Sequence, residues 1–363
     1  MNSVYLDSNG FGRYVVSKKK RRLDKKRIIL LVIAFLFFWI LSGFNLNLPD
    51  SENYISLFSR TQSGVTFYAV ETGFWLLVQL AVKVGIDFKL FLRIYSFIAV
   101  FLIALTINRY SKKFIFVFFS FFCYSFLLDL VQIRFFMGMA LCLFSIRFLE
   151  DFSIKNLILY CAFAFLASTQ HLIFLSFFIF LLSYLKNVKA VRIISIVGLF
   201  LSLFLGSLFL RSSLATYIFS LRNKTVVYEG GIGSSAAVFY FVFFALLYAF
   251  AFYITHLYRD KLLKYTFIYK YLLVSLAFLP FILLDYQYTR LMRGIVIALY
   301  IYISNCLASL SNRQKPLYYS IYLILIAAVG LKLFGPGSGY FDLITKNVFE
   351  YNDFLNWIAS LFN

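Results

Sequence analysis

The sequence predicts an all-α polytopic integral membrane protein with about 11–12 transmembrane helices. Of its 363 residues, 62% are apolar and only 14% are charged, whereas about a quarter of the residues in an ordinary soluble domain are charged. Stretches of about 20 apolar residues, the length that crosses a bilayer, follow one another with short polar breaks. They lack the alternation of apolar and polar residues that a β-barrel needs, so we expect helices throughout.

The N-terminal segment, residues 1–27, predicts the orientation of the chain. Residues 18–27 read KKKRRLDKKR and stand directly before the first apolar run. Basic segments beside a membrane helix stay in the cytoplasm and attract anionic lipid. We therefore interpret the formal charge of +20 as a topology signal, with membrane lipids and not nucleic acid as the partner. No small-residue cleavage site follows Ile28–Phe44, so this segment is expected to remain as a helix.

Twelve apolar segments follow along the chain. They cover about residues 28–44, 65–84, 88–107, 114–131, 135–149, 157–170, 172–185, 193–210, 237–256, 265–284, 294–310 and 317–334. Four basic breaks, each an even number of segments from the next, are expected to be cytoplasmic loops. These breaks are Arg109–Lys113, Lys186–Arg192, Arg259–Lys264 and Asn312–Lys315.

The first three segments conflict with this topology. Three crossings between Arg27 and Arg109 would place the second basic region outside, so one segment should not cross. Segment 65–84 is the best candidate because it carries Glu71, Gly73 and Lys83. We expect it to be re-entrant or interfacial, which leaves eleven crossings. The alternative is that all twelve segments cross and the charge rule is broken once.

This topology gives a single transmembrane domain, residues 28–334, without a soluble domain. The polar regions 45–72 and 211–236 become outer loops, and the tail 335–363 lies at the outer face. We expect substrate specificity to reside in the 211–236 loop and in the outer aromatic residues. Chemistry in such a protein has to use loops and helix ends at the membrane surface.

The sequence contains no motif for a metal or nucleotide cofactor. The four cysteines stand inside apolar runs without a CxxC or Cys/His spacing, at Cys123, Cys142, Cys161 and Cys306. The chain has two histidines, His171 and His256, and no Walker-type glycine loop. We therefore predict no cofactor.

Gln132-Ile133-Arg134, between two apolar runs, is the most informative local sequence. An arginine at the N-terminus of a helix is suited to bind phosphate or pyrophosphate, because its forked donors add to the helix dipole. The alternative is an interfacial arginine that reaches lipid headgroups. Arg134, with Gln132 beside it, is our first candidate for a phosphate-binding site.

Two further residues are candidates for acid–base chemistry. His171 interrupts a 29-residue apolar stretch, which is about right for a pair of helices, and so marks an outer turn. It is either an acid, base or phosphate ligand or a structural histidine. Glu71 lies in an apolar segment, so it needs a partner or a chemical role. It is a general base, or it pairs with an outer arginine such as Arg134, or both.

The stretch from Asp285 to Arg293 reads DYQYTRLMR. Arg290 and Arg293 are three residues apart and therefore share a helix face, which suits a diphosphate. Asp285 is a candidate partner for them, and Tyr286 and Tyr288 could stack on sugar rings. The alternative is an aromatic belt with snorkelling arginines.

Three stretches, in this order, resemble the EpsG-like branch of the Wzy-type polysaccharide polymerases. They are Glu71-Thr-Gly73-Phe74, Val131-Gln-Ile-Arg134-Phe-Phe-Met-Gly-Met-Ala140 and Ser168-Thr-Gln-His171, within roughly residues 50–185. Two positions depart from the family pattern. Phe135 replaces a second glutamine, and Leu172 replaces a basic or small polar residue after His171, which bears most on the role of that histidine.

The resemblance implies a membrane glycosyltransferase that polymerises undecaprenyl-pyrophosphate-linked oligosaccharide repeat units into capsule, exopolysaccharide or O-antigen. It would act at the outer face of the bacterial cytoplasmic (inner) membrane, with a flippase and a chain-length regulator as partner proteins. Arg134, Arg290 and Arg293 would stabilise the pyrophosphate leaving group, and Glu71 or His171 would take the proton from the acceptor hydroxyl.

Two other functions compete with this one. A flippase or exporter of the same lipid-linked saccharide would also need cations, but along a central cavity and not gathered at one face. Another membrane glycosyltransferase that uses a lipid-linked donor would depend on Asp50 or Glu52 in the first outer loop. A channel or ion transporter is disfavoured because no pair of broken helices stands in matching halves.

Overall fold

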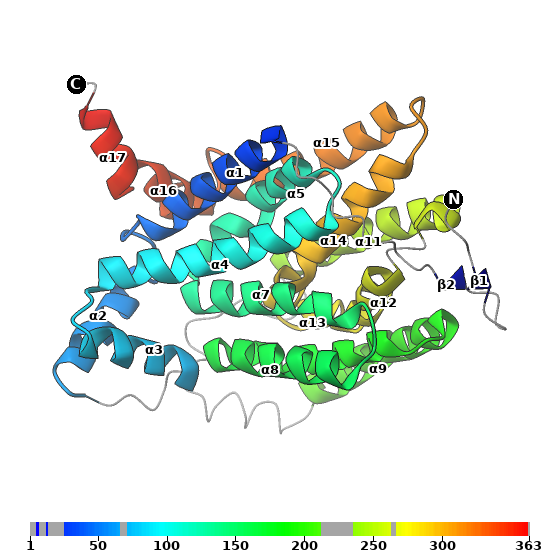
Figure 1. Cartoon of the computed structure of the whole chain (residues 1–363), viewed down its shortest axis with the longest axis horizontal. Coiled ribbons are helices and arrows are strands. Elements are labelled where there is room, and N and C mark those ends of the chain that lie inside the picture. Colours follow the sequence, from blue (N-terminus) through cyan, green and yellow to red (C-terminus); the bar gives the residue numbers. More distant parts are fainter. Residues whose placement is uncertain are drawn as a thin grey trace.

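The computed structural model describes residues 5–6, 12–13, 25–65, 71–211, 235–262 and 266–361. Most of the predicted 211–236 loop and residues 18–24 of the basic N-terminal cluster therefore lie outside the described residues. The described chain is helical apart from one short antiparallel pair of strands, β1 (Tyr5–Leu6) and β2 (Gly12–Arg13). The predicted all-α membrane fold is confirmed (Figure 1).

Most of the helices coincide with the predicted apolar segments, and the others lie in the predicted outer loop 45–72 and in the tail 335–363. The first half of the chain contains α1 (Lys25–Gly43), α2 (Ser51–Gln62), α3 (Thr72–Lys83), α4 (Phe88–Tyr110), α5 (Phe114–Phe121), η1 (Phe122–Phe126), α6 (Leu127–Val131), α7 (Ile133–Ser145), η2 (Ile146–Leu149), α8 (Ile154–Gln170) and η3 (Leu172–Tyr184). The second half contains α9 (Val188–Arg211), α11 (Ser235–Leu262), α12 (Thr266–Ser275), η5 (Leu276–Phe278), α13 (Phe281–Leu284), η6 (Tyr286–Tyr288), α14 (Thr289–Ser309), α15 (Lys315–Phe334), η7 (Phe341–Lys346), α16 (Asn347–Glu350) and α17 (Asp353–Ser360).

Seven of the described helical stretches are long and apolar enough to cross a membrane, so the chain is a multi-pass membrane protein. They are Lys25–Gly43, Phe88–Tyr110, Phe114–Val131, Ser235–Tyr258, Thr266–Leu284, Tyr286–Ser309 and Lys315–Phe334. The shorter α7 with η2, α8 and η3, and the 24-residue α9, run beside them in the same bundle. Figure 1 shows α4, α7 and α8 lying side by side.

The beginning of α1 lies against the end of α4, which fixes the path of the first three segments. The Arg27 side chain donates to Asn108 Oδ1 at 3.0 Å and to the Ser111 carbonyl at 3.0 Å. At the other end of the pair, Trp39 Nε1 donates to the Arg93 carbonyl at 2.9 Å. The intervening α2 and α3 therefore begin and finish at one end of the bundle, as predicted for segment 65–84. Its helix α3 has 12 residues, about 18 Å long against roughly 30 Å of hydrocarbon.

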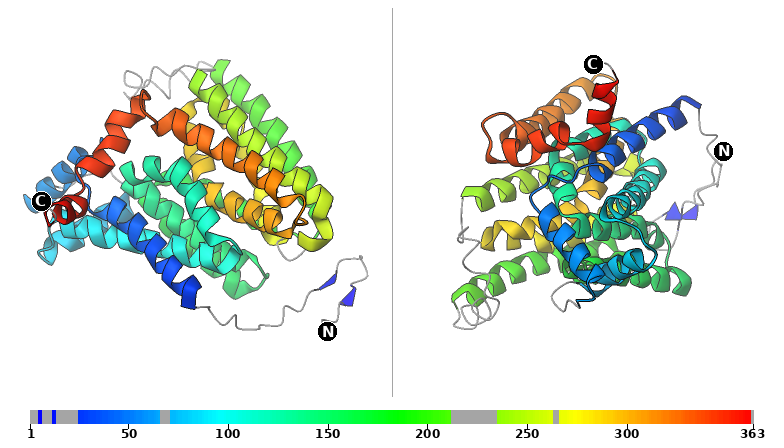
Figure 2. Two further views of the ribbon diagram at one scale, coloured as in Figure 1. Left: turned by 90° about the horizontal axis from the view of Figure 1, so that it is seen from above. Right: turned by 90° about the vertical axis from the view of Figure 1, so that its left-hand side faces the viewer.

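The two ends of the bundle differ in the groups that they hold. The Arg27 end also holds the contacts of Arg109 with Glu150 and of Asn305 with the Tyr110 carbonyl. The α2–α3 end holds the end of α8 and the C-terminal helices, because the Asp353 N–H donates to the Phe44 carbonyl at 2.9 Å. The passes between the two ends are α1, α4, α5–α6, α7–η2, α8, η3, α9, α11, α12–α13, α14 and α15. The right panel of Figure 2 looks onto the α2–α3 end.

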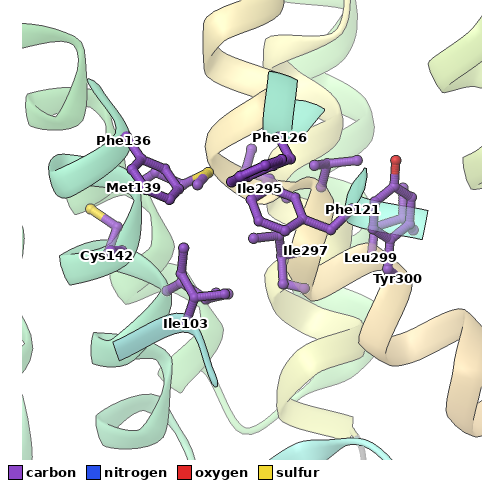
Figure 3. Packing of buried hydrophobic residues seen from close by; sticks show 14 of the residues in the cluster. Ile103, Phe121, Phe126, Phe136, Met139, Cys142, Ile295, Ile297, Leu299 and Tyr300 are labelled. Carbon is purple, nitrogen blue, oxygen red and sulfur yellow. The ribbon is translucent and has the colours of Figure 1, made fainter. Parts of the chain in front are cut away.

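Helix α14 lies at the centre of the bundle. Its residues from Leu291 to Leu307 are all buried, whereas α1 buries four residues, all in its C-terminal half. Figure 3 shows α14 residues such as Ile295 and Ile297 packed among side chains of α4, α5 and α7. Two glycines, one in α7 and one in α14, allow η3 to lie close to these two helices. A Cβ at Gly138 would lie 2.4 Å from the Phe174 ring, and one at Gly294 would lie 2.6 Å from the Phe177 ring.

The predicted segment 114–131 is broken, which its uniform apolar composition did not indicate. Tyr124 has an extended conformation and Ser125 has a φ of 93°, in the left-handed region. Ser125 is the sole residue other than glycine with a positive φ in the described part of the chain. The break is covered by α15, where a Cβ at Gly330 would lie 2.8 Å from the Cys123 carbonyl oxygen. The break separates α5 from the short α6, which carries Asp129.

Candidate functional site

The predicted site residues gather at the α2–α3 end of the bundle. Glu71 immediately precedes α3, and Arg134 is the second residue of α7. His171 stands in the turn between α8 and η3, as predicted. Arg290 and Arg293 lie in the first turns of α14. Helix ends from four separate parts of the sequence thus form one cluster.

Arg134 is the centre of the cluster. Its Nη1 forms an ion pair with Glu71 Oε2, so the expected Glu71–Arg134 pair is confirmed. The guanidinium carbon lies 5.8 Å from the ring centroids of both Tyr54 and Phe74, close enough for cation–π attraction. Its Nε is buried without a hydrogen-bond partner. The Arg134 side chain keeps 28% of its surface exposed, so it combines a fixed orientation with access for a ligand.

Gly73 allows α3 to hold Glu71 against α7. A Cβ at this position would lie 2.2 Å from Thr169 Oγ1 and 2.8 Å from Gln170 Nε2, closer than side-chain packing permits. Gln170 is itself fixed by Tyr95, whose hydroxyl donates to Gln170 Oε1 at 2.8 Å. The Glu71-Thr-Gly73 sequence therefore combines a charged ligand for Arg134 with the small residue that lets α3 approach the end of α8.

Arg293 forms a fully buried ion pair with Asp129. Arg293 Nε donates to Asp129 Oδ1 at 2.8 Å, its Nη2 contacts the same oxygen, and Ser125 donates to Oδ2. The side chains of Arg293 and Asp129 are 5% and 0% exposed. Asp285 was the predicted candidate partner of Arg290 and Arg293, but the partner of Arg293 is Asp129. Asp285 accepts the Gln287 N–H at 2.9 Å and so caps the turn that precedes α14.

Asp129 was missed as a site residue, although the sequence contains a signal for it. It stands three residues before Gln132 as the sole charged residue of the 114–131 run, and a carboxylate in such a run requires a partner. Its partner is 164 residues away in the chain. Gln132 belongs to the same network, because its Oε1 lies 3.4 Å from Arg293 Nη2.

His171 is neutral in this environment. Burial, followed by the charges of Arg290, Arg134 and Arg293, lowers its pKa from 6.5 to about 3. Its Nδ1 faces the Ile173 N–H at 3.4 Å, which leaves Nε2 to carry the proton. Phe135 packs against both His171 and Arg293. The centroid of its ring lies 5.7 Å from that of the His171 ring and 4.8 Å from the Arg293 guanidinium carbon. An anion bound among these arginines would raise the pKa of His171 again.

Asp50 also belongs to this site, although it was weighed only for a competing function. It precedes α2, and its side chain makes no capping hydrogen bond to the first turn of that helix. Burial raises the pKa of its carboxyl group, while the charges of Arg290 and Arg134 oppose this effect. Asp50 therefore lies within the field of two of the three arginines that surround His171.

The two tyrosines of the 285–293 stretch lie beside this cluster in the turn η6. Tyr288 is 38% exposed and packs its ring 5.8 Å from that of Phe281. Tyr286 is partly buried. Their place at the same helix end as Arg290 is compatible with the predicted stacking on sugar rings, which stays a prediction.

The fold and the site define the class: a polytopic helical membrane protein with arginines, carboxylates and one neutral histidine gathered at one end of its bundle. The EpsG family model matches residues 28–351, and the chain belongs to the EpsG family. The match extends well beyond the 50–185 region that carried the resemblance in the sequence. No curated protein and no solved structure matches the chain.

Proposed function

We propose that this protein polymerises lipid-linked oligosaccharide repeat units at the outer face of the bacterial cytoplasmic membrane, with the α2–α3 end outside. The substrate is undecaprenyl-pyrophosphate-linked oligosaccharide. The growing glycan leaves its pyrophosphate and is joined to the non-reducing end of an incoming lipid-linked unit. The observation that carries the proposal is the convergence of Arg134, Arg290 and Arg293 on the turn that holds His171.

The reaction assigns a role to each partly exposed group. A hydroxyl oxygen of the acceptor sugar attacks the anomeric carbon of the donor, the bond from that carbon to the pyrophosphate breaks, and undecaprenyl pyrophosphate leaves. Arg134 and Arg290 stabilise the charge that develops on the leaving group. Arg293, which is buried against Asp129, adds to this stabilisation electrostatically, without direct contact with the leaving group. Energy comes from the bond already present in the donor.

The proton of the acceptor hydroxyl goes to Glu71 or His171. Glu71 lies next to Arg134 and is 22% exposed, so substrate that engages Arg134 frees this carboxylate. The pKa of His171 of about 3 makes the imidazole a weak base, and bound pyrophosphate strengthens it. The two candidates can be distinguished, because only a histidine base requires this substrate-dependent rise.

The test is complementation of a deletion strain with wild type, Arg134→Ala and His171→Ala at matched membrane levels. The readout is the length of the lipid-linked saccharide on a gel and the leaflet in which single units accumulate. Arg192→Ala is the matched control, because Arg192 is an exposed arginine near the Arg27 end that donates to Tyr269 at 3.3 Å. It should restore the full ladder.

A polymerase gives single units on the outer leaflet in the deletion strain and in Arg134→Ala, with a ladder in wild type. Units trapped on the inner leaflet would instead identify a flippase, and a ladder that persists in the deletion strain would refute the proposal. The arginines of the described site lie at helix ends and not along a central cavity, which favours the polymerase over the flippase.

A further inference from the structure

One ridge of α4 carries two cations followed by two phenyl rings. Lys89, Arg93, Phe97 and Phe101 succeed one another at intervals of four residues and so form a row along one helix face. The exposed fractions of Phe97 and Phe101 are 40% and 45%. The opposite face of α4 carries Tyr95, which bonds Gln170 at the site described above. The ridge and the site are therefore separated by about one helix diameter, roughly 10 Å.

The two cations are held only loosely by protein groups. Lys89 Nζ lies 3.4 Å from Asp353 Oδ2, and Arg93 Nη2 lies 3.9 Å from the same oxygen. The three side chains are 54%, 34% and 41% exposed, for Lys89, Arg93 and Asp353 respectively, and exposed pairs of this kind contribute about 0–1 kcal/mol. Arg93 Nε is buried without a hydrogen-bond partner. Lys89 and Arg93 can therefore release the single carboxylate of Asp353 and bind an anion of higher charge.

Aromatic side chains continue from the cations along the bundle. The Arg93 guanidinium lies 4.5 Å from the Phe44 ring centroid. Trp39 and Phe35 of α1 pack against Phe97, with ring centroids 5.4 Å and 5.1 Å apart. Phe97 stacks on Phe101 at 6.1 Å. On α4, a row of apolar side chains therefore begins next to the two cations Lys89 and Arg93, which lie near the start of this membrane-crossing helix.

We infer that the Lys89–Arg93 ridge is a second binding site for a phosphate-bearing lipid. The cations hold the phosphate group, and the apolar chain lies along Phe97 and Phe101. Within the proposed function, on which this part rests, the lipid is the acceptor. Its non-reducing sugar reacts beside Arg134 while its own pyrophosphate stays attached to the lipid. The acceptor pyrophosphate therefore needs a separate place at the same end of the bundle.

The experiment measures lipid binding to the purified full chain in phosphatidylcholine nanodiscs. The probes are undecaprenyl pyrophosphate and phosphatidylglycerol, each titrated against wild type and Lys89→Gln/Arg93→Gln. We expect at least tenfold weaker binding at one site in the double variant. Lys189→Gln/Arg192→Gln removes the same charge from exposed positions at the Arg27 end and should bind as wild type does.

Asp353→Asn provides a test of opposite sign that does not depend on a loss of folding. It removes the carboxylate that competes for both cations, so lipid binding should become severalfold tighter. Dependence of undecaprenyl pyrophosphate binding alone on the ridge supports the acceptor lipid, whereas dependence of both probes supports a general lipid-phosphate site. Unchanged binding of both probes to the double variant, or no gain in Asp353→Asn, overturns the inference. Neither result depends on polymerase activity.

Discussion

Replacing Asp129 with asparagine removes the counterion of a guanidinium whose side chain is 5% exposed. Two Arg293 nitrogens contact one Asp129 oxygen, and Ser125 occupies the other, so the variant leaves a buried charge without compensation. Breaking such a pair by removing one partner costs about 3–5 kcal/mol. Asp353→Asn breaks an exposed pair and should cost less than about 1 kcal/mol.

The assay is equilibrium unfolding of the detergent-solubilised chain, followed by tryptophan fluorescence. Asp129→Asn and Arg293→Gln should each destabilise the fold by several kcal/mol. The double variant should recover most of that loss, because replacing both members of a buried pair is often nearly neutral. If Asp129→Asn unfolds within about 1 kcal/mol of wild type, or if the losses of the two single variants add in the double variant, the pair does not have the role assigned here.

Three further outcomes are expected. Gly73→Ala should abolish the saccharide ladder, since its Cβ would lie 2.2 Å from Thr169 Oγ1, and Thr169→Gly should restore it in part; Gly339→Ala, with open space around it, should have no effect. The pKa of His171 is about 3 in the folded chain and 6.5 ordinarily, so the unfolded chain binds more protons between these two pH values. Stability should therefore fall as the pH drops from 6.5 towards 3. If the thermal stability of His171→Gln has the same slope against pH as that of wild type, this reasoning is contradicted. Arg134→Lys should leave polymerisation as low as Arg134→Ala in the gel assay, because lysine lacks the forked donors, and a full ladder would show that charge alone suffices.

Hydropathy and charge predicted most of the fold because the bilayer imposes simple rules on length and on basic loops. The odd number of segments between Arg27 and Arg109 was enough to predict that one of them does not cross, and the contact of Arg27 with Asn108 agrees. The break at Ser125 could not be predicted in this way. The break brings the Ser125 hydroxyl into a hydrogen bond with Asp129, and average hydropathy does not report such local bonds.

The sequence predicted some members of this cluster and some of its pairings, but not Asp129. Glu71 and Arg134 could be paired because a charge within an apolar segment, such as Glu71, needs a partner, and Arg134 stands between two apolar runs. The partner of Arg293 was sought nearby in Asp285, whereas the structure supplies Asp129 from a distant helix. Spacing along the chain identifies residues that share a helix face, but the partner from another helix is set by packing. The Tyr54 ring against Arg134 was missed for the same reason.

The central place of α14 also constrains the order in which the chain can be assembled during synthesis. Helices emerge from the ribosome in sequence order, and Arg293 follows Asp129 by 164 residues. At translation rates of about 5–20 residues per second, Asp129 waits roughly 8–30 s for its counterion. The early helices therefore enter the membrane before α14 has been made, and during that interval the Asp129 carboxylate lacks its Arg293 counterion.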